Sequence, residues 1–155
     1  LGLLLLLMAA SMLACLGYAI YDDEPAMVAD RALGLSAAIT GAAGGLLLLV
    51  GRGADRDILR KEAIAIVGLG WTVSAIFGGL PYVFTTPSLP PAAAFFESAS
   101  GFTTTGASVI ADVEIFPRGI LLWRATTQWL GGMGILVLFV AVLSMLGVGS
   151  KSLFR

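Results

Sequence analysis

Four long apolar stretches separated by shorter polar ones dominate this chain. They run from about residue 1 to 21, 33 to 50, 63 to 82 and 119 to 148. A bilayer core about 30 Å thick needs roughly 20 apolar residues in helical form, so each stretch is predicted to cross a membrane. The last is longer than a crossing needs, which predicts a tilt, a kink or an extension beyond the lipid. The pattern predicts an all-α membrane protein with four transmembrane helices.

A fifth apolar stretch is too short to cross. Residues 92–100 follow Pro87, Pro90 and Pro91, and nine residues of helix span only about 14 Å, half a bilayer. Proline is favoured in the first turn of a helix, and Ser88 could cap this one. A short apolar segment of this kind predicts a re-entrant helix between the third and fourth spans.

The residues after that short helix have the composition of an ion path. Thr103, Thr104, Thr105 and Gly106 follow it, and non-helical backbone at membrane depth persists only when buried in protein or lining water. Their carbonyls could replace the hydration shell of a cation, and Gly106 can adopt a positive φ. The negative end of the helix dipole favours a cation at the same place. This predicts an ion-selectivity filter; the alternative is a polar external loop with a short surface helix.

Four charged residues lie near this segment. Glu97 is on the short helix and Arg124 is about one turn into the fourth span. Charges at membrane depth are costly and usually paired or functional, so Arg124 is predicted to pair with Glu97 or with nearby carbonyls, supporting the filter. The alternative is that Arg124 extends to the outer interface. Asp112 and Glu114, just beyond the filter, could concentrate cations at its mouth.

Composition narrows the function classes. Apolar residues make up 58% of the chain and charged residues 12%, against about half and a quarter in a soluble domain. The single cysteine, Cys15, excludes an internal disulfide, and without histidine a metal site would need carboxylates. A net charge of −1 gives no electrostatic basis for binding nucleic acid. No cofactor is predicted. The chain is expected to be surrounded by membrane lipid.

The basic residues predict the orientation. They follow the second and fourth spans, whereas the loop after the first span is acidic. The basic residues are Arg52, Arg56, Arg60 and Lys61 in the loop and Lys151 and Arg155 in the tail. Positively charged loops stay in the cytoplasm, so both ends are predicted to be cytoplasmic and the connection carrying the filter to face outward.

Glycines cluster on the fourth span, at Gly131, Gly132 and Gly134. Such residues allow helices in lipid to approach closely. A hinge in the helix is one interpretation, and tight helix packing is the one we favour.

Two motifs resemble a known family. Residues 95–108 resemble the first pore loop of the Trk/Ktr/HKT potassium transporters, and residues 123–135 resemble the helix that follows it. The resemblance implies four helix–pore-loop–helix repeats around one pore. Residues 63–150 would be the first repeat and 151–155 the start of the linker to the next. Residues 1–62 would be the extra N-terminal helix pair and cytoplasmic loop of the TrkH/TrkG branch.

The resemblance also implies a function. The chain would be the N-terminal part of a potassium uptake subunit in the inner membrane of a bacterium or archaeon, without enzymatic activity. Potassium would bind at Thr104, Thr105 and Gly106, with Thr103 completing one quarter of the filter. The implied partners are the remaining three repeats, a second copy in a homodimer and a cytoplasmic ring of nucleotide-binding regulatory subunits. A sodium-permeable member, a homotetrameric channel of short subunits and a non-conducting scaffold are the alternatives.

Overall fold

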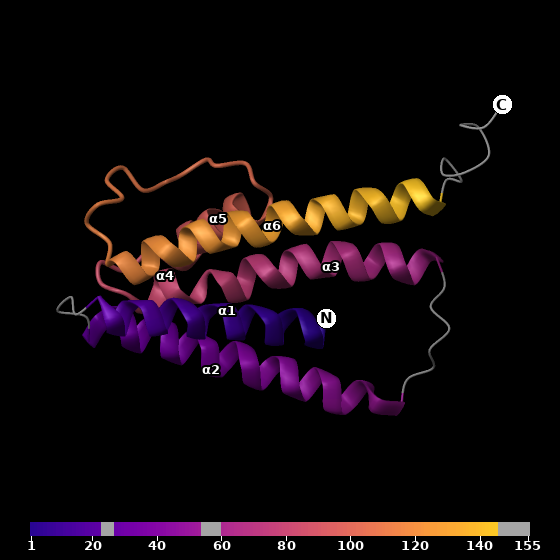
Figure 1. The fold of residues 1–155 in the computed structure, drawn as a ribbon, viewed down its shortest axis with the longest axis horizontal. Coiled ribbons are helices and arrows are strands. Elements are labelled where there is room, and N and C mark those ends of the chain that lie inside the picture. The colour runs from indigo at the N-terminus through magenta and orange to yellow at the C-terminus, as the bar shows by residue number, and fades with distance from the viewer. Residues whose placement is uncertain (23–26, 54–59, 146–155) are drawn as a thin grey trace.

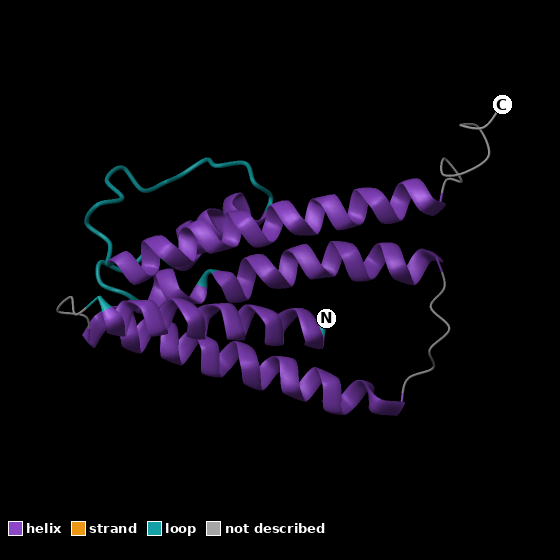
Figure 2. Cartoon of the chain, in the orientation of Figure 1, coloured by secondary structure: helices purple, strands orange, loops and turns teal. Residues whose placement is uncertain are grey.

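Within the described residues, all the regular secondary structure is helical. The computed structural model describes residues 1–22, 27–53 and 60–145. Its helices, shown in Figures 1 and 2, are α1 (Gly2–Tyr21), α2 (Met27–Val50), the short turn η1 (Gly51–Gly53), α3 (Arg60–Gly78), α4 (Leu80–Phe84), α5 (Pro91–Phe102) and α6 (Arg118–Met145). The second helix begins at Met27 rather than at residue 33.

Within the described residues, three segments are long and apolar enough to cross a membrane by length and composition. They are Gly2–Tyr21, Ala29–Val50 and Ala65–Phe84. The longest described helix, α6, has 28 residues. Because the side chains of residues 141–145 lie outside the described part, the fourth crossing stays a prediction. The predicted linker at 151–155 and the charges of Arg56, Lys151 and Arg155 also lie outside it, and the orientation stays a prediction.

The third span, predicted over residues 63–82, is divided between two helices. It consists of α3 and α4, with Gly79 between them. Pro81 has no N–H to continue the helical ladder, and the Tyr82 amide donates to the Gly79 carbonyl at 3.1 Å. The Gly78 carbonyl is therefore left without its helical donors. The indole Nε1 of Trp123 on α6 donates to it at 3.0 Å.

The predicted short helix is α5, and it is longer than expected. It has twelve residues, from Pro91 to Phe102, or about 18 Å of helix, still too short to cross a bilayer. Proline occupies the first turn as predicted, but the N-cap is Pro90 and has no side-chain hydrogen bond, so the cap predicted at Ser88 was wrong. Figure 2 shows the connection from α5 running back toward the start of α6.

Close packing holds α5 between α3 and α6. A side chain at Gly78 would meet the Phe102 ring at 2.5 Å, and the Phe102 ring lies edge-on to Trp123 with centroids 6.5 Å apart. A side chain at Gly131 on α6 would overlap the Phe102 carbonyl oxygen. Trp123 is fully buried. These contacts fix the end of α5, and with it the start of the predicted filter.

Replacing Trp123 with phenylalanine in the full-length protein is expected to destabilise it. The Gly78 carbonyl would be buried without a donor, which costs about 1–3 kcal/mol. The measurement is the thermal unfolding midpoint in detergent. Trp129→Phe is the matched control, because Trp129 is 64% exposed. Equal midpoints for the two variants would contradict a role for the indole N–H.

Candidate ion-binding site

The predicted filter (residues 103–106) begins as a turn folded back onto the end of α5. Thr103 is the C-cap of the helix. The amides of Thr104 and Thr105 donate to the carbonyls of Gly101 and Ser100 at 2.9 and 3.0 Å. This pair of bonds is the Schellman arrangement, in which a glycine usually occupies the left-handed position. Here that position is taken by Thr104, with φ 56°.

The sign of φ alternates along this segment. It is negative at Thr103 (−80°), positive at Thr104, and positive again at Gly106 (74°), whereas Thr105 is not among the positive-φ residues. A β-branched residue at positive φ is unusual and costs roughly 1–2 kcal/mol. Successive amides in right-handed then left-handed conformations converge on one side. That side is occupied by the carbonyls at the end of α5.

Three of the four carbonyls in residues 103–106 accept no hydrogen bond within the described part of the chain. The Thr103 carbonyl accepts a bond from the Thr104 hydroxyl at 2.7 Å. Within the described residues, no hydrogen bond is donated to the carbonyls of Thr104, Thr105 or Gly106. Residues 103–108 are all exposed. The three residues predicted to bind potassium therefore carry carbonyls available to a ligand.

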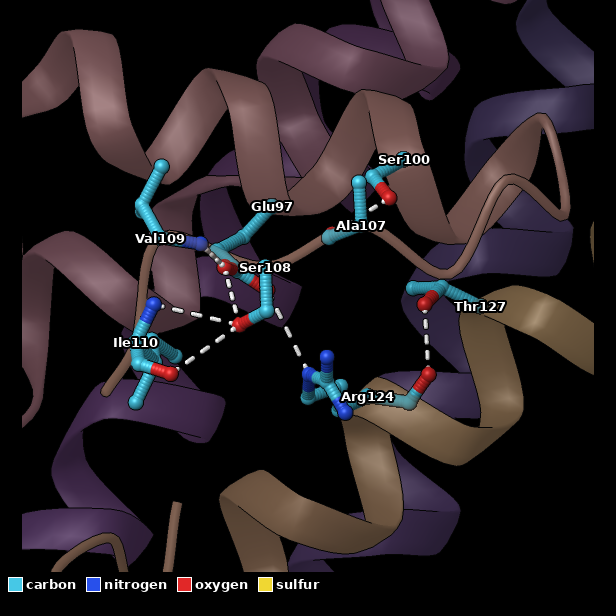
Figure 3. A network of polar contacts seen from close by, with 8 residues as sticks. All are labelled: Glu97, Ser100, Ala107, Ser108, Val109, Ile110, Arg124 and Thr127. Atoms are coloured by element: carbon cyan, nitrogen blue, oxygen red, sulfur yellow. Dashed lines mark hydrogen bonds and ion pairs between the residues drawn. The ribbon is translucent and has the colours of Figure 1, made fainter. Parts of the chain in front are cut away.

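The chain leaving the segment is tied to α5 by two side chains (Figure 3). The Ser100 hydroxyl donates to the Ala107 carbonyl at 2.6 Å. The Oε1 atom of Glu97 accepts bonds from the Ser108 hydroxyl at 2.7 Å and the Val109 amide at 2.6 Å. Both the entry and the exit of the predicted filter are thus fixed to one short helix.

Glu97 also forms the predicted ion pair with α6. The Nε of Arg124 lies 3.3 Å from Glu97 Oε2. The Glu97 side chain is 1% exposed and that of Arg124 25%. The predicted pairing is confirmed, and Arg124 is not extended away from Glu97. One carboxylate joins α5, the returning chain and α6, which meets the requirement that a buried charge be paired and hydrogen-bonded.

The glycines of α6 allow close packing here rather than a visible hinge. Gly131 lies against the Phe102 carbonyl, and a side chain at Gly132 would meet only the Thr104 methyl, at 3.8 Å. On α5, Gly101 lies against Thr127 so closely that a side chain would overlap its hydroxyl. The continuous helix through these glycines supports the packing interpretation.

The acidic residues beyond the segment form an exposed turn. Asp112 and Glu114 are both exposed, and the Asp112 carboxylate accepts the Glu114 amide at 3.0 Å. Among the described residues, no group of three or more Asp, Glu, Cys or His could hold a metal ion. The prediction that Asp112 and Glu114 concentrate cations at the mouth of the filter therefore rests on their charge alone.

Sequence reasoning missed the two serines that hold the exit of the segment, Ser100 and Ser108. A signal for one was present, because Ser100 lies three residues after Glu97 and so on the same face of α5. Ser108 lies in irregular chain, where no periodicity indicates which residue it contacts. The left-handed conformation at Thr104 was also unexpected, since the residue is β-branched.

Glu97→Gln in the full-length protein is expected to lower its free energy of unfolding by about 3 kcal/mol, because Arg124 would lose the charge that compensates it. Exchanging the two charges should not restore stability, since arginine at 97 cannot accept the Ser108 and Val109 bonds. Glu114→Gln, at an exposed site, is the control in thermal unfolding. A shift no larger than that of the control would contradict the role assigned to Glu97.

Comparison with known proteins shows what this chain resembles. The TrkH family model, described as a cation transport protein, matches residues 35–155. The Trk system potassium uptake protein TrkH of Salmonella typhimurium is 41% identical over 156 residues, which is 99% of this chain and 32% of that protein. TrkH of Halomonas elongata is 46% identical over 118 residues, 76% of this chain and 24% of that protein.

A solved structure matches the fold. The crystal structure of the potassium transporter TrkH from Vibrio parahaemolyticus superposes with a TM-score of 0.86 and 35% identity, over 98% of this chain and 32% of that one. The chain thus spans about a third of the length of the relatives it matches most fully. The family match and the shared helical fold show that the chain belongs to the TrkH family of cation transport proteins.

Proposed function

We propose that residues 104–106 line the ion path of a potassium uptake protein. The observation that carries this proposal is that the carbonyls of three consecutive exposed residues accept no hydrogen bond within the described part of the chain. Backbone carbonyls in such a position substitute for the hydration shell of a cation in potassium filters. The amides, which would repel a cation, bond back to the end of α5.

The position of residues 104–106 favours the binding of a cation. The segment directly follows the C-terminus of α5, where the helix dipole is negative. Glu97 and Ser100 hold its exit to the same helix. Carbonyls held in place lose less free energy in ordering around a dehydrated ion than mobile ones do, so these bonds would contribute to ion selection.

Potassium is the proposed ion because relatives are named potassium uptake proteins and position 106 is glycine. The segment would supply one quarter of a filter, with Thr103 at its edge and three further repeats supplying the rest. Residues 63–150 would be the first repeat and residues 1–62 an N-terminal pair. The proposal includes a homodimer in a bacterial or archaeal inner membrane, both ends of this chain cytoplasmic, regulated by a nucleotide-binding ring and performing no covalent chemistry.

Gly106→Ser in the full-length protein is expected to reduce selectivity for K⁺ over Na⁺ by about tenfold, because a side chain at φ 74° is disfavoured by roughly 1–2 kcal/mol. A side chain at this position would have no neighbour within 4 Å, so the effect would come from the backbone. Uptake of both ions is measured in cells lacking their own potassium uptake.

The control is Gly45→Ser on α2, which also has open space around it but ordinary helical φ. Wild-type protein that admits both ions equally would favour the sodium-permeable alternative. A protein that reaches the membrane and carries neither ion would favour the scaffold. Unchanged selectivity in Gly106→Ser would remove Gly106 from the filter.

A further inference from the structure

We propose that the N-terminal helix α1 positions the filter by holding the outer part of α6 against α5. This inference rests on the proposed function, because the effect expected is on ion selection. It assigns a role to the first helix pair, which lies outside the repeat that contains the filter.

The backbones of α1 and α6 approach closely at Gly119. A side chain there would lie 2.7 Å from the Ala19 methyl and 3.3 Å from a methyl of Leu33 on α2. Ala19 and Leu33 are both buried. Glycine is the residue that allows helices in lipid to approach this closely, so the helix pair and α6 are fitted to each other at this point.

Two polar contacts flank this point, one on each side along the helices. Arg118 forms an ion pair with Asp22 at 3.0 Å, and the Cys15 sulfur lies 3.6 Å from the Thr126 hydroxyl. Successive contacts move toward the start of α1 as they move along α6, so the two helices run antiparallel, as Figure 1 shows. The contact thus extends over two turns of each helix.

The same turns of α6 hold the filter's supporting helix on another face. Thr127, next to Thr126, lies against Gly101 near the end of α5, and Arg124 pairs with Glu97. Both α1 and α5 pack against α6. A displacement of α6 by α1 would therefore move Arg124 and Thr127, the α6 residues that contact α5 at Glu97 and Gly101.

The contact with α1 and the contact with Glu97 lie close together along α6. Gly119 and Arg124 are five residues apart, which is about 7.5 Å of helix. Packed helices transmit displacement rather than absorbing it, because close-packed interiors have low compressibility. A single methyl placed between α1 and α6 is therefore expected to act on the filter.

The test adds or removes single methyl groups on the two sides of the α1–α6 contact in the full-length protein. Gly119→Ala adds a methyl against Ala19, Ala19→Gly removes one, and the double variant restores the fit. Gly119→Ala is expected to lower selectivity for K⁺ over Na⁺ at least about threefold, within the range for mutations distant from a site. The double variant is expected to recover the wild-type ratio, which a change in protein amount cannot imitate.

Gly44→Ala is the matched control. Its side chain would meet the Gly2 carbonyl and the Leu5 side chain, each at 3.0 Å, between α1 and α2. This contact, although less tight than the 2.7 Å approach at Gly119, also places a methyl group against α1, and none of its three nearest atoms belongs to α6. It is expected to lower thermal stability while leaving the ion ratio unchanged. Cys15→Ala, which removes the Thr126 contact without adding bulk, is the milder variant should Gly119→Ala not reach the membrane.

The outcomes separate this inference from the function on which it rests. Wild-type protein that carries no potassium would overturn both. Potassium-selective wild-type protein would overturn the inference alone if every α1–α6 variant that reaches the membrane kept the wild-type ratio. Failure of the double variant to recover a ratio altered in Gly119→Ala would also overturn it. Recovery in the double variant, with no change in Gly44→Ala, supports α1 as the positioning element.

Discussion

A buried carboxylate that must have partners organises the candidate site. Glu97 has almost no exposed surface, and an ionised group in such surroundings is stable only when paired and hydrogen-bonded. One of its oxygens accepts bonds from the chain that leaves the predicted filter, and the other pairs with Arg124 on α6. Because this one buried charge must be paired and hydrogen-bonded, it holds α5, the chain after the predicted filter and α6 in one arrangement.

Glycine makes that arrangement sterically possible. The carboxylate can reach its partners only if α5 lies close to both α3 and α6, and side chains at Gly78 or Gly131 would prevent this. The break after α3 adds to the same fit, since it exposes the Gly78 carbonyl to Trp123. The Glu97 ion pair and the close approach of the helices at these glycines therefore depend on each other. A hydropathy pattern predicts neither of them.

The sequence predicted the elements better than their contacts. Length and hydropathy identified the short helix and the segment after it, and cost of burial identified the pair of Glu97 and Arg124. The interruption at Gly79 was missed, because the apolar pattern continues through it and only the missing N–H of Pro81 indicates a break. The bond of Ser108 to Glu97 was missed because irregular chain has no period from which a neighbour could be inferred.

The left-handed conformation of Thr104 has a consequence for the order of assembly. Its own preferences oppose that conformation, so the free chain around it would favour other shapes. Only the end of α5, fixed in turn by α3 and α6, offers the carbonyls that the turn requires. We therefore expect this turn to form only after the surrounding helices have packed, so that its conformation depends on the folded helices rather than on the threonine-rich sequence alone.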